Sequence, residues 1–120
     1  MKVQELDVWK AAIDLAADTY KITSNFPEDH TQGLGHHLRT SVTHLPAKIA
    51  AAASRKYGQE SLDYLFNAKS LVYEIETMYY LAEKLGYIDS DMLEQKIDQV
   101  DSSKRLLFGF IKHYKKTANP

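Results

Sequence analysis

The sequence predicts an all-α protein folded as a single antiparallel up-down four-helix bundle. Apolar residues recur at intervals of three and four along most of the 120 residues, which is the period of an amphipathic helix. No segment shows the strict alternation of a half-buried strand. Prolines and glycines divide the chain into four helix-length segments with short connections, the pattern of a bundle. We therefore treat residues 1–120 as one domain with one core.

The first two helices are predicted over about residues 6–25 and 35–56. The first ends before Pro27, because the residue preceding a proline is biased away from helical geometry. Pro46 lies inside the second helix. A proline there removes a backbone donor and clashes with the carbonyl of Val42, at a usual cost of ~3 kcal/mol. We expect Pro46 to interrupt this helix and to set a bend in it.

The third and fourth helices are predicted over about residues 59–85 and 89–116. Gly86 follows the third helix, where a residue that tolerates positive φ commonly ends a helix. Asp89 is a favourable N-cap for the fourth. Acidic residues lie early in the fourth helix and lysines late, which complements the helix dipole.

Composition excludes several classes of function. A formal net charge of −1 provides no global field for nucleic acid or anionic lipid. The absence of cysteine excludes disulfides and thiolate chemistry, and fits a reducing compartment. We find no membrane span, no signal peptide and no motif for a nucleophile, a phosphate loop or paired catalytic carboxylates. We expect a cytoplasmic protein without catalytic residues, cofactor, metal or small-molecule substrate.

Helices one and three carry more apolar surface than a lone bundle requires. The two apolar stripes of helix one span roughly 220°, whereas a surface helix of a monomer needs a stripe little wider than ~100°. In helix three we assign one stripe to the core: Ala68, Leu71, Ile75, Met78, Ala82 and Leu85. We expect the second stripes to contact other subunits of a homo-oligomer. The predicted interface residues are Val8, Leu15, Ile22, Leu62, Leu65, Phe66, Val72 and Tyr73.

A polar line, which we call the helix-two stripe, follows one side of the second helix. Its members are His37, Ser41, His44, Lys48 and Arg55. Three interpretations stay open: a solvated face, a polar seam between subunits, or a contact for phosphate groups of RNA or DNA. The basic end of the fourth helix, at Lys112, Lys115 and Lys116, could add to a nucleic-acid surface. Metal binding is not expected, because His37 and His44 are two helical turns apart.

Several segments together resemble the bacterial four-helix-bundle family encoded in intervening sequences of 23S ribosomal RNA genes. The resemblance rests on the opening Leu6-Asp7-Val8-Trp9, the stop Phe26-Pro27, Leu38-Arg39, the run Leu45-Pro46-Ala47-Lys48-Ile49-Ala50, and Leu85-Gly86-Tyr87-Ile88. It implies an all-α homo-oligomer, typically a ring of five, without established catalytic activity. The related accessory variability proteins of diversity-generating retroelements form a similar pentamer that contacts nucleic acid.

The chain departs from the family pattern just after the proline. The family tends to read Ser-Ile-Pro-x-Asn-Ile-Ala-Glu-Gly, whereas Lys48, Ala51 and Ala52 stand here in place of Asn, Glu and Gly. An activity that depended on those three positions would be lost or altered in this chain.

Overall fold

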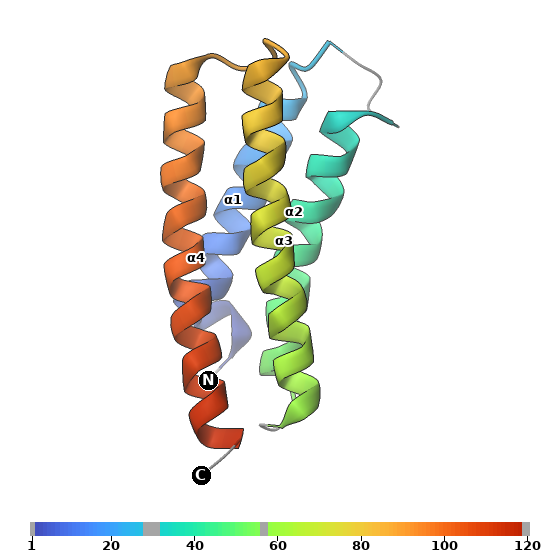
Figure 1. The fold of residues 1–120 in the computed structure, drawn as a ribbon. Helices are drawn as coiled ribbons and strands as arrows, with labels where there is room; N and C mark the ends of the chain where they lie inside the picture. The colour runs from blue at the N-terminus through green and yellow to red at the C-terminus, as the bar shows by residue number, and fades with distance from the viewer. Residues whose placement is uncertain (1, 28–31, 56–57, 119–120) are drawn as a thin grey trace.

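Four α-helices form the molecule in the computed structural model, which describes residues 2–27, 32–55 and 58–118 (Figure 1). They are α1 (Asp7–Thr23), α2 (Leu34–Ala53), α3 (Gln59–Lys84) and α4 (Ser90–Ala118), with a short 3-10 turn, η1 (Val3–Glu5), before α1. The helices run alternately up and down, and the described residues contain no strand. The predicted fold class, an all-α four-helix bundle, is confirmed.

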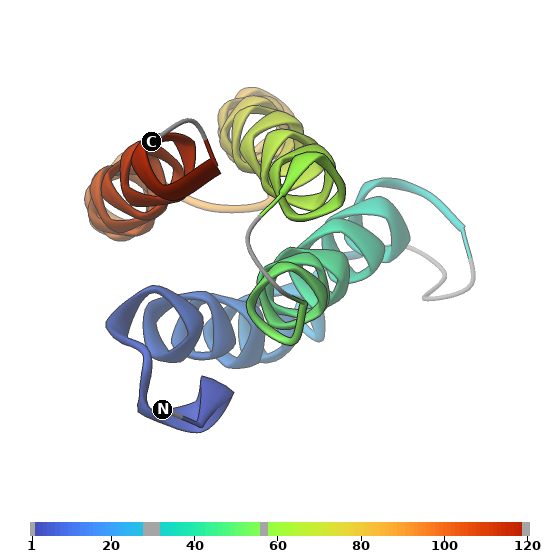
Figure 2. The same ribbon diagram turned by 90° about the horizontal axis from the view of Figure 1, so that it is seen from below.

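Each helix packs against its neighbours in sequence, and α4 returns to pack against α1. Seen from the end of the bundle, α1 and α3 therefore lie at diagonal corners (Figure 2). Each of these two helices is therefore flanked by α2 on one side and α4 on the other.

Local signals place the connection between α3 and α4. Gly86 adopts φ 78°, and the amide of Tyr87 donates to the carbonyl of Ala82 at 2.9 Å, the hydrogen bond of a Schellman cap. The carboxylate of Asp89 accepts from the amide of Met92 at 2.8 Å, as an N-cap does. The described helix ends lie within two residues of the predicted ones; the predicted end of the second helix, near Lys56, lies outside the described residues.

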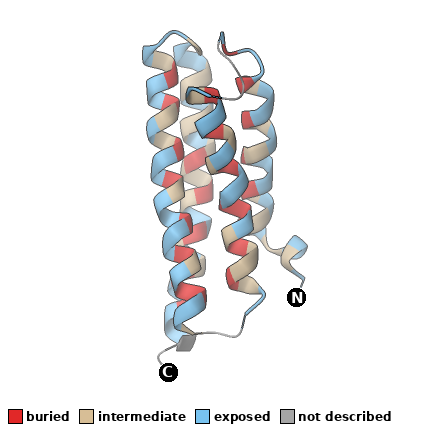
Figure 3. Cartoon of the chain, turned by 90° about the vertical axis from the view of Figure 1, so that its right-hand side faces the viewer, coloured by how far each residue is buried: buried red, intermediate tan, exposed pale blue. Residues whose placement is uncertain are grey.

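The core consists of inward side chains from all four helices. Figure 3 colours the buried residues red, and they recur along each helix. Leu15, Leu38, Leu65 and Leu107 are among its fully buried members. Tyr79 is the largest of them, and its hydroxyl meets Thr19 of α1 across the bundle at 2.5 Å. A polar pair thus lies inside the core, and Thr23, Ser61 and Ser103 are the other buried polar side chains among the described residues.

Five of the eight predicted interface residues prove to be core residues of the single chain. They are Val8, Leu15, Leu62, Leu65 and Val72, and none is more than 5% exposed. For these five residues the prediction was wrong, because each helix packs against two neighbours and much of its apolar surface is buried between them. The assignment of Leu85 to the core was also wrong, since its side chain is 51% exposed beyond the end of α3. Ile22 is half-buried, and only Phe66 and Tyr73 are exposed.

Pro46 does not interrupt the second helix. It is buried within α2, which continues on both sides of it. The effect of the ring on the helix is therefore the loss of one backbone donor toward Val42 and not a break. That Pro46 bends α2 stays a prediction.

Candidate functional site

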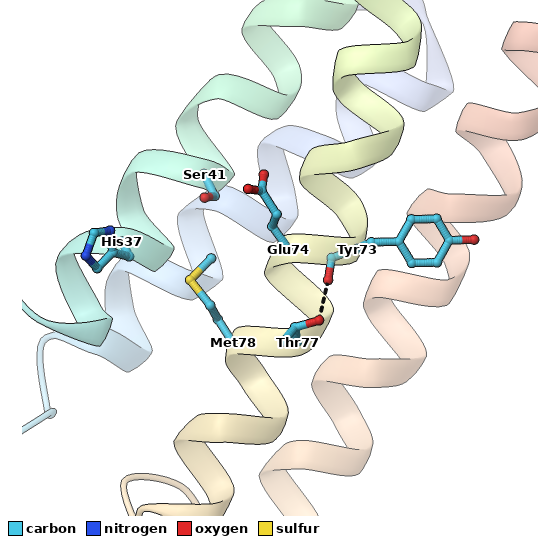
Figure 4. A pocket seen from close by; sticks show the side chains of 6 residues that line it. All are labelled: His37, Ser41, Tyr73, Glu74, Thr77 and Met78. Carbon is cyan, nitrogen blue, oxygen red and sulfur yellow. Dashed lines mark hydrogen bonds between the residues drawn. The ribbon is translucent and has the colours of Figure 1, made fainter.

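The upper part of the helix-two stripe lies along a groove between α2 and α3. His37 and Ser41 of α2 line a cavity of about 410 Å³ together with Glu74, Thr77 and Met78 of α3. In Figure 4, the Glu74 and Met78 side chains extend toward α2, whereas that of Tyr73 points away toward α4. A carboxylate therefore shares the groove with the imidazole, which weakens it as a site for phosphate.

The lower part of the stripe gathers around Tyr64 of α3. The ammonium of Lys48 lies 5.5 Å from the centre of the Tyr64 ring, and the guanidinium of Arg55 lies 5.1 Å from it. Arg55 also donates to the Tyr64 hydroxyl at 3.3 Å and pairs with Glu60 at 3.2 Å. His44 lines the adjoining 250 Å³ hollow with Lys48. The structure thus splits the stripe into two groups, and the Arg55 charge is matched by a carboxylate.

A second groove, between α3 and α4, was not predicted. Its 270 Å³ hollow is lined by Phe66, Lys69, Phe108, Ile111, Lys112 and Lys115, and we call it the lysine–phenylalanine groove. The ammonium of Lys69 lies 5.1 Å from the centre of the Phe108 ring, and that of Lys115 lies 5.3 Å from the Phe66 ring. Each ring therefore carries a cation in the geometry of a cation–π contact.

The groove continues toward Tyr73, whose ring centre lies 6.5 Å from that of Phe108. There Lys104 stands 4.7 Å above the Tyr73 ring and pairs with Glu76 at 2.8 Å and with Asp101 at 3.7 Å. The hydrogen bond to Glu76 raises the pKa of Lys104. This end of the groove is neutralised.

The three lysines of the groove itself differ from Lys104 in their electrostatic surroundings. No carboxylate of the described residues pairs with Lys69, Lys112 or Lys115. No acidic residue lines the hollow either. The groove is therefore a concentration of positive charge on a chain with a net charge of −1.

Polar side chains elsewhere hold helices together. Arg39 of α2 donates through Nε to the Thr23 hydroxyl at 2.8 Å and through Nη2 to the Tyr20 carbonyl at 3.1 Å. Its guanidinium also lies 4.9 Å from the Tyr20 ring centre. Burial raises the pKa of Tyr79 to about 12. Because Tyr79 is fully enclosed, we assign this hydroxyl a structural role.

Two further kinds of site, a metal site and a membrane-spanning helix, were sought in the described part of the chain. Within residues 2–27, 32–55 and 58–118, no three His, Cys, Asp or Glu side chains are grouped as a metal site would require. None of the helices in these ranges is both long enough and apolar enough to cross a bilayer.

Comparison with known proteins identifies one family. The model of a family described as 23S rRNA-intervening sequence protein matches residues 4–109, which confirms the resemblance carried by the motifs. The match includes Pro46, the helix-two stripe and the α3 side of the lysine–phenylalanine groove, whereas Lys112 and Lys115 lie beyond it. No curated protein matches the chain.

Proposed function

The chain belongs to the 23S rRNA-intervening sequence protein family, whose function is unknown, and we propose that it is a non-catalytic cytoplasmic protein that assembles with copies of itself and acts by contacting other macromolecules. The observation that carries the proposal is the presence of exposed apolar side chains on two different helices of the bundle, α1 and α3.

One set of exposed apolar side chains lies at the C-terminal end of α3. Tyr80, Leu81 and Leu85 are each between 45% and 51% exposed. A second set lies on α1, where Ile13 is 37% and Tyr20 is 44% exposed. Exposed apolar patches of this kind mark contact surfaces in soluble proteins.

The two sets lie on different helices, α1 and α3, which occupy diagonal corners of the bundle (Figure 2). In the α1 set, the Tyr20 hydroxyl lies 3.0 Å from that of Thr43, so this ring lies along the α2 side of α1. A contact between the α3 set of one copy and the α1 set of the next is head-to-tail, and such contacts form a ring when the rotation between successive copies closes. The family resemblance supports a ring of five. The exposed remainder of the predicted interface, Phe66 and Tyr73, lies on the α4 side of α3 and is not needed for this contact.

Light scattering on a size-exclusion column at micromolar concentration tests the assembly. The expected mass is a multiple of the 13.7 kDa chain. The double variant Leu81→Lys/Leu85→Lys should shift the protein toward the monomer, because it places charge within the α3 set. The matched control is Asn67→Lys, an exposed position on the same helix. A wild-type protein that elutes as a stable monomer contradicts the proposal.

Association with RNA or DNA is the second candidate function. Between Lys104 and Lys116, α4 carries basic residues and no acidic one, and the helix-two stripe adds Lys48 and Arg55. Repetition of these cations by symmetry would raise the local charge. A filter-binding titration should show affinity at low salt that falls steeply as salt is added. An absence of binding at low salt removes this candidate.

A further inference from the structure

We propose that the lysine–phenylalanine groove between α3 and α4 is a binding site for single-stranded nucleic acid. The proposal rests on the second candidate function and deepens it by naming the surface and the type of strand. It moves the contact from the helix-two stripe to a groove formed by Phe66, Lys69, Phe108, Lys112 and Lys115.

The charge of the groove selects a polyanion. The ammonium groups of three lysines border the hollow, and none of the residues that line it is acidic. Among the described residues, no carboxylate pairs with any of these three lysines. The helix-two stripe offers less, because Glu74 lines one of its grooves and Glu60 pairs with Arg55. Lysines contribute to binding by neutralising phosphates and releasing counterions.

The aromatic rings select unpaired bases over a duplex. Phe66 is 39% exposed, and a lysine ammonium now lies over its ring. When a base stacks on this ring, the flexible lysine can move from the ring face to the neighbouring phosphate. Bases in a duplex have their faces covered by other bases, so only a single strand gains from the phenyl rings. An acidic peptide would use the lysines but would gain no comparable stacking.

Fluorescence anisotropy measures the binding. The probes are a labelled 20-nucleotide thymidine homopolymer and a labelled 20-base-pair duplex, each titrated between 50 and 200 mM salt. We expect the wild-type protein to bind the single strand more tightly than the duplex. Phe66→Ala should weaken single-strand binding by about fivefold or more, the usual effect of removing a stacked ring. Because Phe66 is exposed, this variant should keep its fold, which circular dichroism checks.

Two charge variants separate the groove from the stripe. Lys112→Gln/Lys115→Gln should reduce the slope of log affinity against log salt by about 1.4, since each phosphate contact to a single strand contributes about 0.7. Lys48→Gln/Arg55→Gln removes the same formal charge from the helix-two stripe and should leave both the affinity and the slope nearly unchanged.

The possible failures are distinguishable. If the wild-type protein binds neither probe at 50 mM salt, the candidate function and the groove proposal fail together. If it binds but only the stripe variant loses affinity, the groove proposal fails while nucleic-acid association stands. Equal affinity for both probes with no effect of Phe66→Ala refutes base stacking. Competition by poly-glutamate as effective as competition by unlabelled single strand refutes nucleic acid as the occupant.

Discussion

The hydrogen bond between Thr19 and Tyr79 should be the most strongly coupled polar contact in the bundle. Both side chains are 0% exposed, and their oxygens lie 2.5 Å apart between α1 and α3. Water cannot replace either partner without opening the core. We propose to remove the partners one at a time and together, with Thr19→Val, Tyr79→Phe and the double variant.

The expected free energies follow from what each change leaves behind. Thr19→Val leaves the Tyr79 hydroxyl buried without a partner, at a cost of about 2 kcal/mol. Tyr79→Phe leaves the Thr19 hydroxyl, which can turn to a carbonyl one helical turn earlier, at a cost of about 1 kcal/mol. The double variant leaves neither group unpaired and should lose only about 1 kcal/mol. The coupling free energy is then about 2 kcal/mol.

Urea denaturation followed by circular dichroism measures these values, at one protein concentration because assembly couples to stability. For a chain of this size, 1 kcal/mol corresponds to a shift in Tm of about 3–6 °C. Tyr80→Phe is the matched control, since the neighbouring ring is 51% exposed, and we expect a change below about 0.5 kcal/mol. Additive losses in the double variant would refute the coupling.

Three further predictions concern pH and the backbone. Burial raises the pKa of Tyr79 from 10.0 to about 12, so the folded state holds this proton more tightly than the unfolded state. The contribution of this group to the free energy of unfolding is therefore fully present below pH 10 and falls by up to about 3 kcal/mol as the pH rises to 12. Alkaline denaturation should show a smaller loss of stability in Tyr79→Phe than in the wild type. Pro46→Ala should change thermal stability or assembly if the ring sets a bend in α2, and a thermal melt and an elution profile that both match the wild type would remove that role. Gly109 lies in α4 where an added Cβ meets nothing within 4 Å, so Gly109→Ala should stabilise the chain by about 0.5–1 kcal/mol in urea denaturation; a destabilised variant would indicate a neighbour at this position.

The features that were predicted correctly from the sequence, namely the helix ends and the family motifs, depend on residues close together in the chain. Gly86 and Asp89 end one helix and begin the next through contacts within a few residues, so they could be read directly. The family motifs, including the run around Pro46, are also local. Burial within the single chain was harder to predict. The spacing of Leu65 and Val72 in the sequence indicates an apolar face, but not whether that face packs against a neighbouring helix or another subunit.

The candidate groove depended on tertiary register. Lys112 and Lys115 were recognisable as a basic helix end, but nothing local pairs Lys69 of α3 with Phe108 of α4. That pairing depends on the axial register of the two antiparallel helices. The Thr19–Tyr79 contact was missed for the same reason, since its partners are sixty residues apart.

The distribution of charge along α4 has a consequence for any assembly. Its first half carries Asp91, Glu94, Asp98 and Asp101 with one basic residue, Lys96, and its second half carries Lys104, Arg105, Lys112, Lys115 and Lys116. The helix has 29 residues, or about 43 Å of length. In a ring with every α4 parallel to the symmetry axis, the side-chain charges of α4 are separated in the same direction in all copies. The acidic halves then gather at one rim and the basic halves at the other. The net charge of the chain then says little about the field at either rim, and a polyanion would meet a particle that attracts it from one end and repels it from the other.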